Sequence, residues 1–164
     1  MVKRGLYFMA KPPLKVAELA WYLPRTDKTR GLSQPHVTLL PLFDLAAHPA
    51  DLLTDLLRLM HSFEAPAFRV VFDQIVEHGY VMLRGSEPIL GARRFQERLR
   101  RFLEARGFHF FRSPDEAHMT LRYDRDGLGE QPIDPISWIV EEFFMIESVA
   151  GQHLLHGQWK LRLD

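Results

Sequence analysis

One near-repeat in the sequence sets the strongest limit on how this chain can fold. The tetrapeptide His-x-Thr-Leu occurs at residues 36–39 and again at residues 118–121, half of the 164-residue chain apart. By composition alone, two copies are expected about once in a thousand such chains. Both copies lie in short apolar stretches that are typical of β-strands. The spacing therefore predicts one domain made of two pseudo-symmetric halves, about 1–82 and 83–164, each carrying one copy.

Each copy of the motif has a polar side and an apolar side, because side chains alternate between the two faces of a strand. His36 and Thr38 share one face, His118 and Thr120 share another, and Arg122 continues the second set. One imidazole near its usual pKa can accept a proton while the other donates one, and threonine hydroxyls can bind phosphate oxygens. We therefore predict displacement at phosphorus with His36 and His118 as catalytic residues and the threonines and Arg122 as phosphate ligands. This chemistry requires no metal or other cofactor.

The order of the predicted elements indicates an α+β fold with largely antiparallel sheet. Helical spacing of apolar residues predicts helices over 14–22, 51–63 and 88–106. Alternating and β-branched runs predict strands over 5–10, 36–40, 108–111, 118–123, 137–148 and 158–163, and a hairpin over 68–83. The strand that starts at His36 is expected to end at Pro41, because proline cannot donate to a ladder.

The balance of charge limits the class of partner. The chain has 21 Lys and Arg residues against 21 Asp and Glu residues, which argues against a protein that holds long nucleic acid through many phosphate contacts. A terminal phosphate on RNA or on a small nucleotide remains compatible. The absence of Cys excludes thiol nucleophiles and Cys-ligated zinc. No apolar run reaches the roughly 18 residues of a membrane span or forms a secretory signal. We expect a cytoplasmic monomer with no membrane contact and no obligate protein partner.

The two motifs resemble the signature of the two-histidine phosphoesterases, in particular the 2'-5' RNA ligase or RNA 2',3'-cyclic phosphodiesterase family. The likeness includes the first motif with its preceding Pro35, an early strand that ends in 11–13, and closing strands at 138–148 and 159–161. The resemblance implies a bilobal fold of two sheets flanked by helices, with the active-site cleft between the lobes. It implies hydrolysis of an RNA or nucleotide 2',3'-cyclic phosphate to a 2'-phosphate, with 2'-5' ligation as the reverse reaction.

The resemblance also implies roles for individual residues. His36 would give a proton to the leaving oxygen, and His118 would activate water, although the residues by themselves leave this assignment open. Many relatives carry an arginine a few residues after the second motif, and Arg122 and Arg125 are the arginines available for that position.

Several alternatives stay open at this stage. The chain could be a non-catalytic RNA- or nucleotide-binding module, a phosphoesterase for another ester such as a 2'-5' oligonucleotide, or a structural protein in which the repeat is a relic. His153 and His156 form a His-x-x-His pair, but no further metal ligand stands at a recognised spacing, so we expect solvent-facing side chains. Aromatic candidates for stacking a base are Phe8, Phe43, Phe111 and Tyr123.

Overall fold

The computed structural model describes residues 2–163. The strands are β1 (Gly5–Ala10), β2 (Val37–Asp44), β3 (Phe68–Glu77), β4 (Val81–Arg84), β5 (Met119–Arg122), β6 (Gln131–Val140), β7 (Glu142–Val149) and β8 (Gln152–Lys160). The helices are α1 (Leu14–Trp21), α2 (Ala50–Met60) and α3 (Leu90–Ala105), and a 3-10 turn follows β2 at Leu45–Ala47. Within residues 2–163, no helix is both long and apolar enough to cross a membrane.

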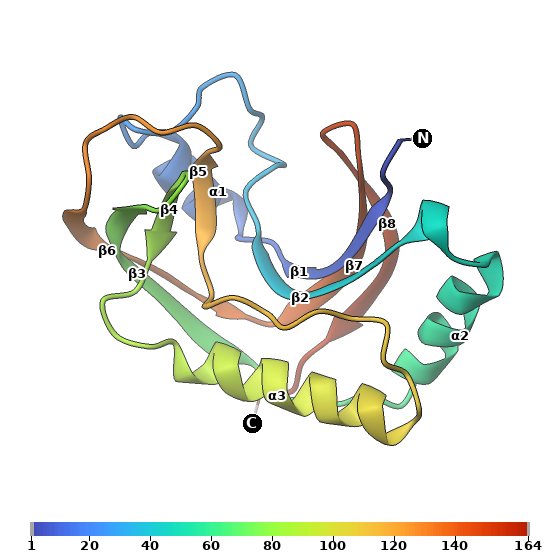
Figure 1. Ribbon diagram of the computed structural model, residues 1–164. Helices are drawn as coiled ribbons and strands as arrows, with labels where there is room; N and C mark the ends of the chain where they lie inside the picture. Colours follow the sequence, from blue (N-terminus) through green and yellow to red (C-terminus); the bar gives the residue numbers. More distant parts are fainter. Residues whose placement is uncertain (1, 164) are drawn as a thin grey trace.

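The eight strands form one sheet in the order β6-β3-β4-β5-β2-β1-β7-β8, and the paired strands are antiparallel. Two four-stranded halves meet where β2 and β5 lie side by side, with Val37 paired to Met119. In Figure 1 the halves rise on either side of this junction, while α3 runs below them and α2 lies at the lower right. The α+β class with antiparallel strands is confirmed, and the two expected sheets are joined into one through the β2–β5 pair.

The two halves of the sheet do not coincide with residues 1–82 and 83–164. One half contains β1, β2, β7 and β8, and the other contains β3, β4, β5 and β6. The chain crosses between them twice, after β2 and again at Glu141 between β6 and β7. The single strand predicted over 137–148 is therefore wrong, because β6 pairs with β3 while β7 pairs with β1.

Two other strand predictions also need correction. β2 continues through Pro41 to Asp44. A proline is tolerated there because β5 pairs with β2 only at Val37, so no neighbouring strand needs an N–H from Pro41 on that side. The segment 108–111, predicted as a strand, has no ladder. The backbone N–H of Arg112 instead donates to the Pro41 carbonyl at 3.0 Å and holds this segment beside β2.

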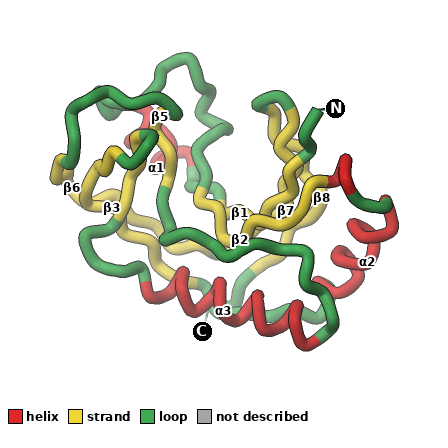
Figure 2. Tube along the Cα trace, in the orientation of Figure 1, coloured by secondary structure: helices red, strands yellow, loops and turns green. Residues whose placement is uncertain are grey.

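The three predicted helices are confirmed, with ends shifted by a few residues. Phe95 and Leu99 of α3, at the predicted spacing, are buried in the same cluster as Val37 and Met119 from the motifs. Gly107 has φ of 76°, the left-handed conformation that commonly follows a helix end. Figure 2 shows the long loops that lead into β2 and β5 at the centre of the sheet. The apolar side of each motif is thus anchored in the core, and its polar side faces away from it.

Candidate active site

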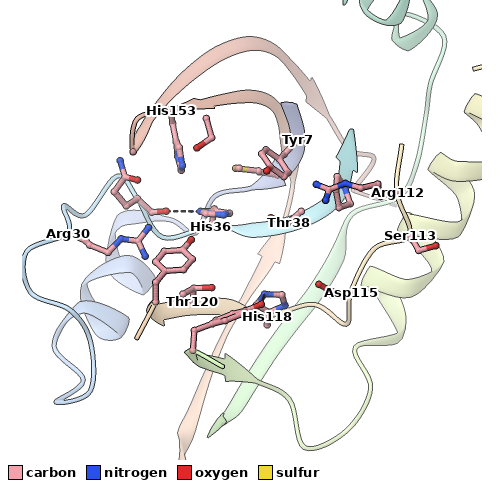
Figure 3. Close-up of a pocket in the computed structure, with 17 residues that line it drawn as sticks. Tyr7, Arg30, His36, Thr38, Arg112, Ser113, Asp115, His118, Thr120 and His153 are labelled. Carbon is pink, nitrogen blue, oxygen red and sulfur yellow. Dashed lines mark hydrogen bonds between the residues drawn. The ribbon is translucent and has the colours of Figure 1, made fainter. Parts of the chain in front are cut away.

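A cavity of about 740 Å³ brings the two motifs together. His36, Thr38, His118 and Thr120 all line it (Figure 3). The alternation predicted for the strands is confirmed, because the intervening Val37, Leu39, Met119 and Leu121 are buried on the core side. Side chains that are far apart in the sequence therefore share one cavity.

The two catalytic candidates are oriented by the same local hydrogen bond. His36 Nδ1 lies 2.8 Å from the carbonyl oxygen of Gln34, and His118 Nδ1 lies 2.8 Å from that of Glu116. A carbonyl oxygen only accepts, so Nδ1 carries the hydrogen and donates it in both cases. In the neutral ring the lone pair is then on Nε2. Each histidine presents Nε2 as the atom that can take up a proton and, once charged, return it.

The surroundings of His36 are cationic. The ring of His153 meets the His36 ring edge-on, with the centroids 5.1 Å apart. Burial is the largest cause that lowers the pKa of His36 to about 4, and repulsion from His153, in its protonated form, and from the charged Lys11 and Arg30 adds to it. The hydrogen bond to the Gln34 carbonyl acts in the opposite direction. His36 is therefore neutral at neutral pH.

The surroundings of His118 are aromatic. The Tyr80 hydroxyl lies 3.5 Å from His118 Nε2, a long contact, and the Tyr80 ring centroid is 6.0 Å from that of Tyr123. Burial raises the pKa of Tyr80, so its hydroxyl keeps its proton and can donate to the Nε2 lone pair. The Arg30 guanidinium lies 4.5 Å from the centroid of the Tyr123 ring. The cavity thus has a cationic end at His36 and an aromatic end at His118.

The structure does not bring Arg122 into the cavity. Among the described residues that line the cavity, Arg30 and Arg112 are present, but Arg122 and Arg125 are not. The Arg122 guanidinium donates to both carboxylate oxygens of Asp124, at 2.9 and 2.7 Å. Strand alternation predicts that Arg122 points to the same face as His118, but this ion pair holds its side chain outside the cavity. A role of Arg122 in phosphate binding stays a prediction.

Several cavity residues were not predicted from the sequence. Arg30 and Arg112 lie in the loops that precede β2 and β5, and Tyr80 lies in the turn between β3 and β4. Loop residues have no periodicity from which a face could be assigned. Among the aromatic candidates only Tyr123 lines the cavity, together with Tyr7 and Tyr80. Phe8 and Phe43 are buried in the core.

The expectation of solvent-facing side chains at His153 and His156 is wrong for His153. This residue lines the cavity, and its Nδ1 lies 2.5 Å from Lys11 Nζ. His156 Nε2 lies 2.7 Å from an oxygen of Glu147, whose carboxylate also binds Arg4. The two rings therefore make unrelated contacts. Over residues 2–163, no three His, Asp or Glu side chains form a group placed to hold a metal ion.

Comparison with known proteins identifies the family. A two-histidine cavity on an antiparallel sheet is the arrangement expected of a phosphoesterase of the kind that the motifs resemble. The family model of the 2'-5' RNA ligase superfamily matches residues 12–152. The chain belongs to this superfamily, and the predicted family is confirmed. No curated protein sequence matches the chain.

Solved structures share the fold over nearly the whole chain. Escherichia coli LigT in complex with 3'-AMP matches with a TM-score of 0.75 and 20% identity, covering 97% of this chain and 98% of LigT. A crystal structure described as a phosphoesterase matches with a TM-score of 0.76 and 20% identity, covering 98% and 99%. The protein TT0787 of Thermus thermophilus matches with a TM-score of 0.69 and 19% identity, covering 98% of this chain and 99% of that protein. LigT has also been solved with phosphate, NADP+ and ATP. At these identities the likeness shows a common fold.

Proposed function

We propose that the protein is an enzyme that hydrolyses the 2',3'-cyclic phosphate end of RNA or of a nucleotide to a 2'-phosphate, without a metal ion. The observation that carries the proposal is the matched pair of histidines, each tied through Nδ1 to a carbonyl and each beside a threonine in one cavity. Membership of the 2'-5' RNA ligase superfamily supports an enzyme, and the phosphate and nucleotide complexes of LigT support this class of ligand.

The proposed reaction needs one proton acceptor and one proton donor. A water oxygen attacks phosphorus while the bond from phosphorus to O3' breaks. In the roles that the family resemblance implies, His118 Nε2 takes the proton of the water and protonated His36 gives a proton to O3'. The hydroxyls of Thr38 and Thr120 donate to the non-bridging oxygens, which become more negative in the transition state. In 2'-5' ligation a 5'-hydroxyl takes the place of water: His118 accepts its proton, the new bond from phosphorus to O5' forms, and His36 again gives a proton to the departing O3'.

His36 can act as the proton donor only if its ring is protonated when the substrate is bound. In the free protein this ring is neutral, because burial and the nearby cations lower its pKa to about 4. A neutral ring cannot donate from Nε2. A bound cyclic phosphate is an anion, and its charge opposes the effect of the cations on the pKa of His36. We therefore infer that His36 gains its proton together with the substrate.

The decisive experiment uses a short RNA that ends in a 2',3'-cyclic phosphate, in the presence of EDTA. The expected product is the 2'-phosphate, and His36→Asn and His118→Asn should each lower the rate by about 10²- to 10⁴-fold. His61→Asn, at an exposed site beyond the end of α2, is the matched control and should keep the wild-type rate.

Three outcomes would contradict the proposal. RNA affinity without turnover between about pH 5 and pH 9 would indicate a binding module. Turnover of 2'-5'-linked oligonucleotides alone would indicate a different ester as the substrate. Loss of hydrolysis in EDTA would show that a metal ion takes part.

A further inference from the structure

A second cavity adjoins the first. It has a volume of about 620 Å³, and it shares Gln34 and His153 with the cavity that holds the two motifs. Lys11 and the loop before β2 form one side, and strands β7 and β8 form the other. Its apolar lining consists of Pro12, Leu32, Pro35, Phe144, Ile146, Leu154 and Leu155. His153 therefore stands at the border between a polar cavity and a more apolar one.

The contact with Lys11 fixes the hydrogen of His153. Lys11 Nζ lies 2.5 Å from His153 Nδ1 and 2.8 Å from the Ser33 carbonyl oxygen. An ammonium group only donates, so His153 Nδ1 accepts and the ring carries its hydrogen on Nε2. Burial first, and then the charges of Lys11 and Arg30, lower the pKa of His153 to about 4, which keeps the ring neutral. His153 Nε2 is thus a permanent N–H donor, and no acceptor for it is found among residues 2–163.

Positive charge at this border has little compensation. Burial and Arg30 lower the pKa of Lys11 to about 8, so its ammonium remains charged at neutral pH. The charges that act on Lys11 and His153 are cations only. Hydrogen bonds from Thr29, and after them the charges of Arg122 and Arg30, lower the pKa of the Asp27 carboxyl. Asp115 lies beside His118, on the other side of the first cavity from His153 (Figure 3). A ligand that carries negative charge at the border would supply the missing counter-charge.

We propose that Lys11 and His153 bind the phosphodiester that precedes the terminal nucleotide, and that the second cavity receives the nucleoside on the far side of that phosphodiester. The substrate is then an oligonucleotide that spans both cavities, with its cyclic phosphate at His36 and His118. This inference rests on the proposed function and names its substrate class. The apolar wall suits a base and ribose, since Leu154 and Leu155 are 46% and 59% exposed.

The test compares two substrates that differ only in the second nucleotide. Adenosine 2',3'-cyclic phosphate has the reacting group alone, and the dinucleotide ApA with a 2',3'-cyclic phosphate adds the phosphodiester and one nucleoside. Wild-type protein should prefer the dinucleotide in kcat/KM by about tenfold or more, because a hydrogen bond to a charged group contributes roughly 1.5–3 kcal/mol. The preference should arise mainly in KM.

Variants of Lys11 and His153 test whether these two residues cause the preference for the dinucleotide. In Lys11→Gln and His153→Phe the ratio of the two kcat/KM values should fall toward one, and His153→Gln, which retains an N–H donor, should keep part of it. Lys15→Gln, an exposed lysine on α1, is the control and should keep the wild-type ratio. Equal kcat/KM for the two substrates in the wild type would overturn the inference and leave the proposed function standing. Survival of the preference in both Lys11→Gln and His153→Phe would also overturn it.

Binding measurements keep the inference testable if neither substrate is hydrolysed. Calorimetry should show that wild-type protein binds ApA 2'-phosphate about tenfold or more tightly than adenosine 2'-phosphate. In Lys11→Gln and His153→Phe the two affinities should become nearly equal. Equal affinities would refute the second subsite, whereas absence of turnover by itself would refute the proposed function.

Nitrogen-15 NMR of the histidine rings tests the Lys11–His153 contact without any ligand. His153 should carry its hydrogen on Nε2 and remain neutral well below the usual histidine pKa of about 6.5. In Lys11→Gln the Nδ1 acceptor loses its charged ammonium donor, so the ring should sample both tautomers and titrate at a higher pH. A wild-type His153 that titrates near its usual pKa would contradict the fixed donor.

Discussion

Val37 is the direct register partner of Met119, at the junction where β2 and β5 join the two halves of the sheet. Each of these residues follows a histidine and precedes a threonine. Because both are buried in the core, their polar neighbours on either side turn toward the cavity. A single backbone pairing thus brings both His-Thr pairs to the same place.

The hydroxyls of Thr38 and Thr120 should contribute to turnover and little to the fold. Replacement by valine preserves the β-branched shape and removes only the hydroxyl. Loss of one hydrogen bond to a charged phosphate should lower kcat/KM by about tenfold to a hundredfold. Thr54→Val, at an exposed position on α2, is the control. Unchanged kinetics in both cavity variants would show that the threonines do not contact the phosphate.

The pKa of His36 should depend on bound anion. In free protein it should be about 4, and inorganic phosphate should raise it by opposing the charges of Lys11 and Arg30. Titration of the ring by NMR, with and without phosphate, measures the shift directly. If the pKa stays the same with phosphate bound, His36 does not acquire its proton in the way that the donor role requires.

Stability should fall as acid is added through the range where histidine normally titrates. The folded-state pKa values of His36 and His153 are about 4, below the unfolded value of about 6.5. The unfolded chain therefore binds more protons as the pH decreases, and the contribution of these rings, complete above about pH 6.5, is lost toward pH 4. Urea unfolding of wild type and of the His36→Asn/His153→Asn double variant should give a shallower pH dependence for the variant. Parallel curves would contradict this prediction.

Arg25 and Asp126 should form the ion pair most important for stability near the cavity. Arg25 is 4% exposed and donates to both carboxylate oxygens of Asp126, at 2.7 and 2.8 Å. Arg25→Met leaves a carboxylate without its partner and should lower the free energy of unfolding by about 3–5 kcal/mol. Arg58→Met removes the exposed pair with Asp55 and should cost only about 0–1 kcal/mol. Similar losses in the two variants would count against a dominant Arg25 pair.

Of the two arginines Arg112 and Arg122, we expect only Arg112 to bind substrate. Arg112 lines the cavity, whereas Arg122 is paired with Asp124 outside it. Arg112→Gln should raise KM by about three- to tenfold, as expected for a partly solvated charged contact, and Arg122→Gln should change KM little. A larger effect of Arg122→Gln would restore the phosphate ligand predicted from strand alternation.

The sequence predicts those parts of the site that depend on local periodicity. Strand alternation was sufficient to select His36 and Thr38, because their buried neighbours determine which face they occupy. It was insufficient for Arg122, since an ion pair with Asp124 two residues away redirects the side chain. Arg30 lies in the loop before β2, where no periodicity indicates the direction of its side chain. His153 lies in β8, far from both motifs in the sequence, and only the folded chain brings it to His36.

Strand partners are a second limit on prediction. An apolar alternating run indicates burial on one face, but it does not indicate the neighbour with which the strand pairs. The run over 137–148 was therefore predicted as one strand, although its two parts pair with β3 and β1 in opposite halves of the sheet. The helices could be predicted more reliably, because the spacing of apolar residues such as Phe95 and Leu99 indicates which face of the helix is buried.

The exchange of strands between the halves has a consequence for synthesis on the ribosome. β1 lies between β2 and β7, so Tyr7 pairs with Ile146 as well as with Pro41. β1, which is translated before β7, acquires its second neighbour only when β7 has left the exit tunnel. Until then one edge of β1 is exposed and open to association with other nascent chains. The cavity, which needs His153 from β8, is accordingly among the last features of the molecule to form.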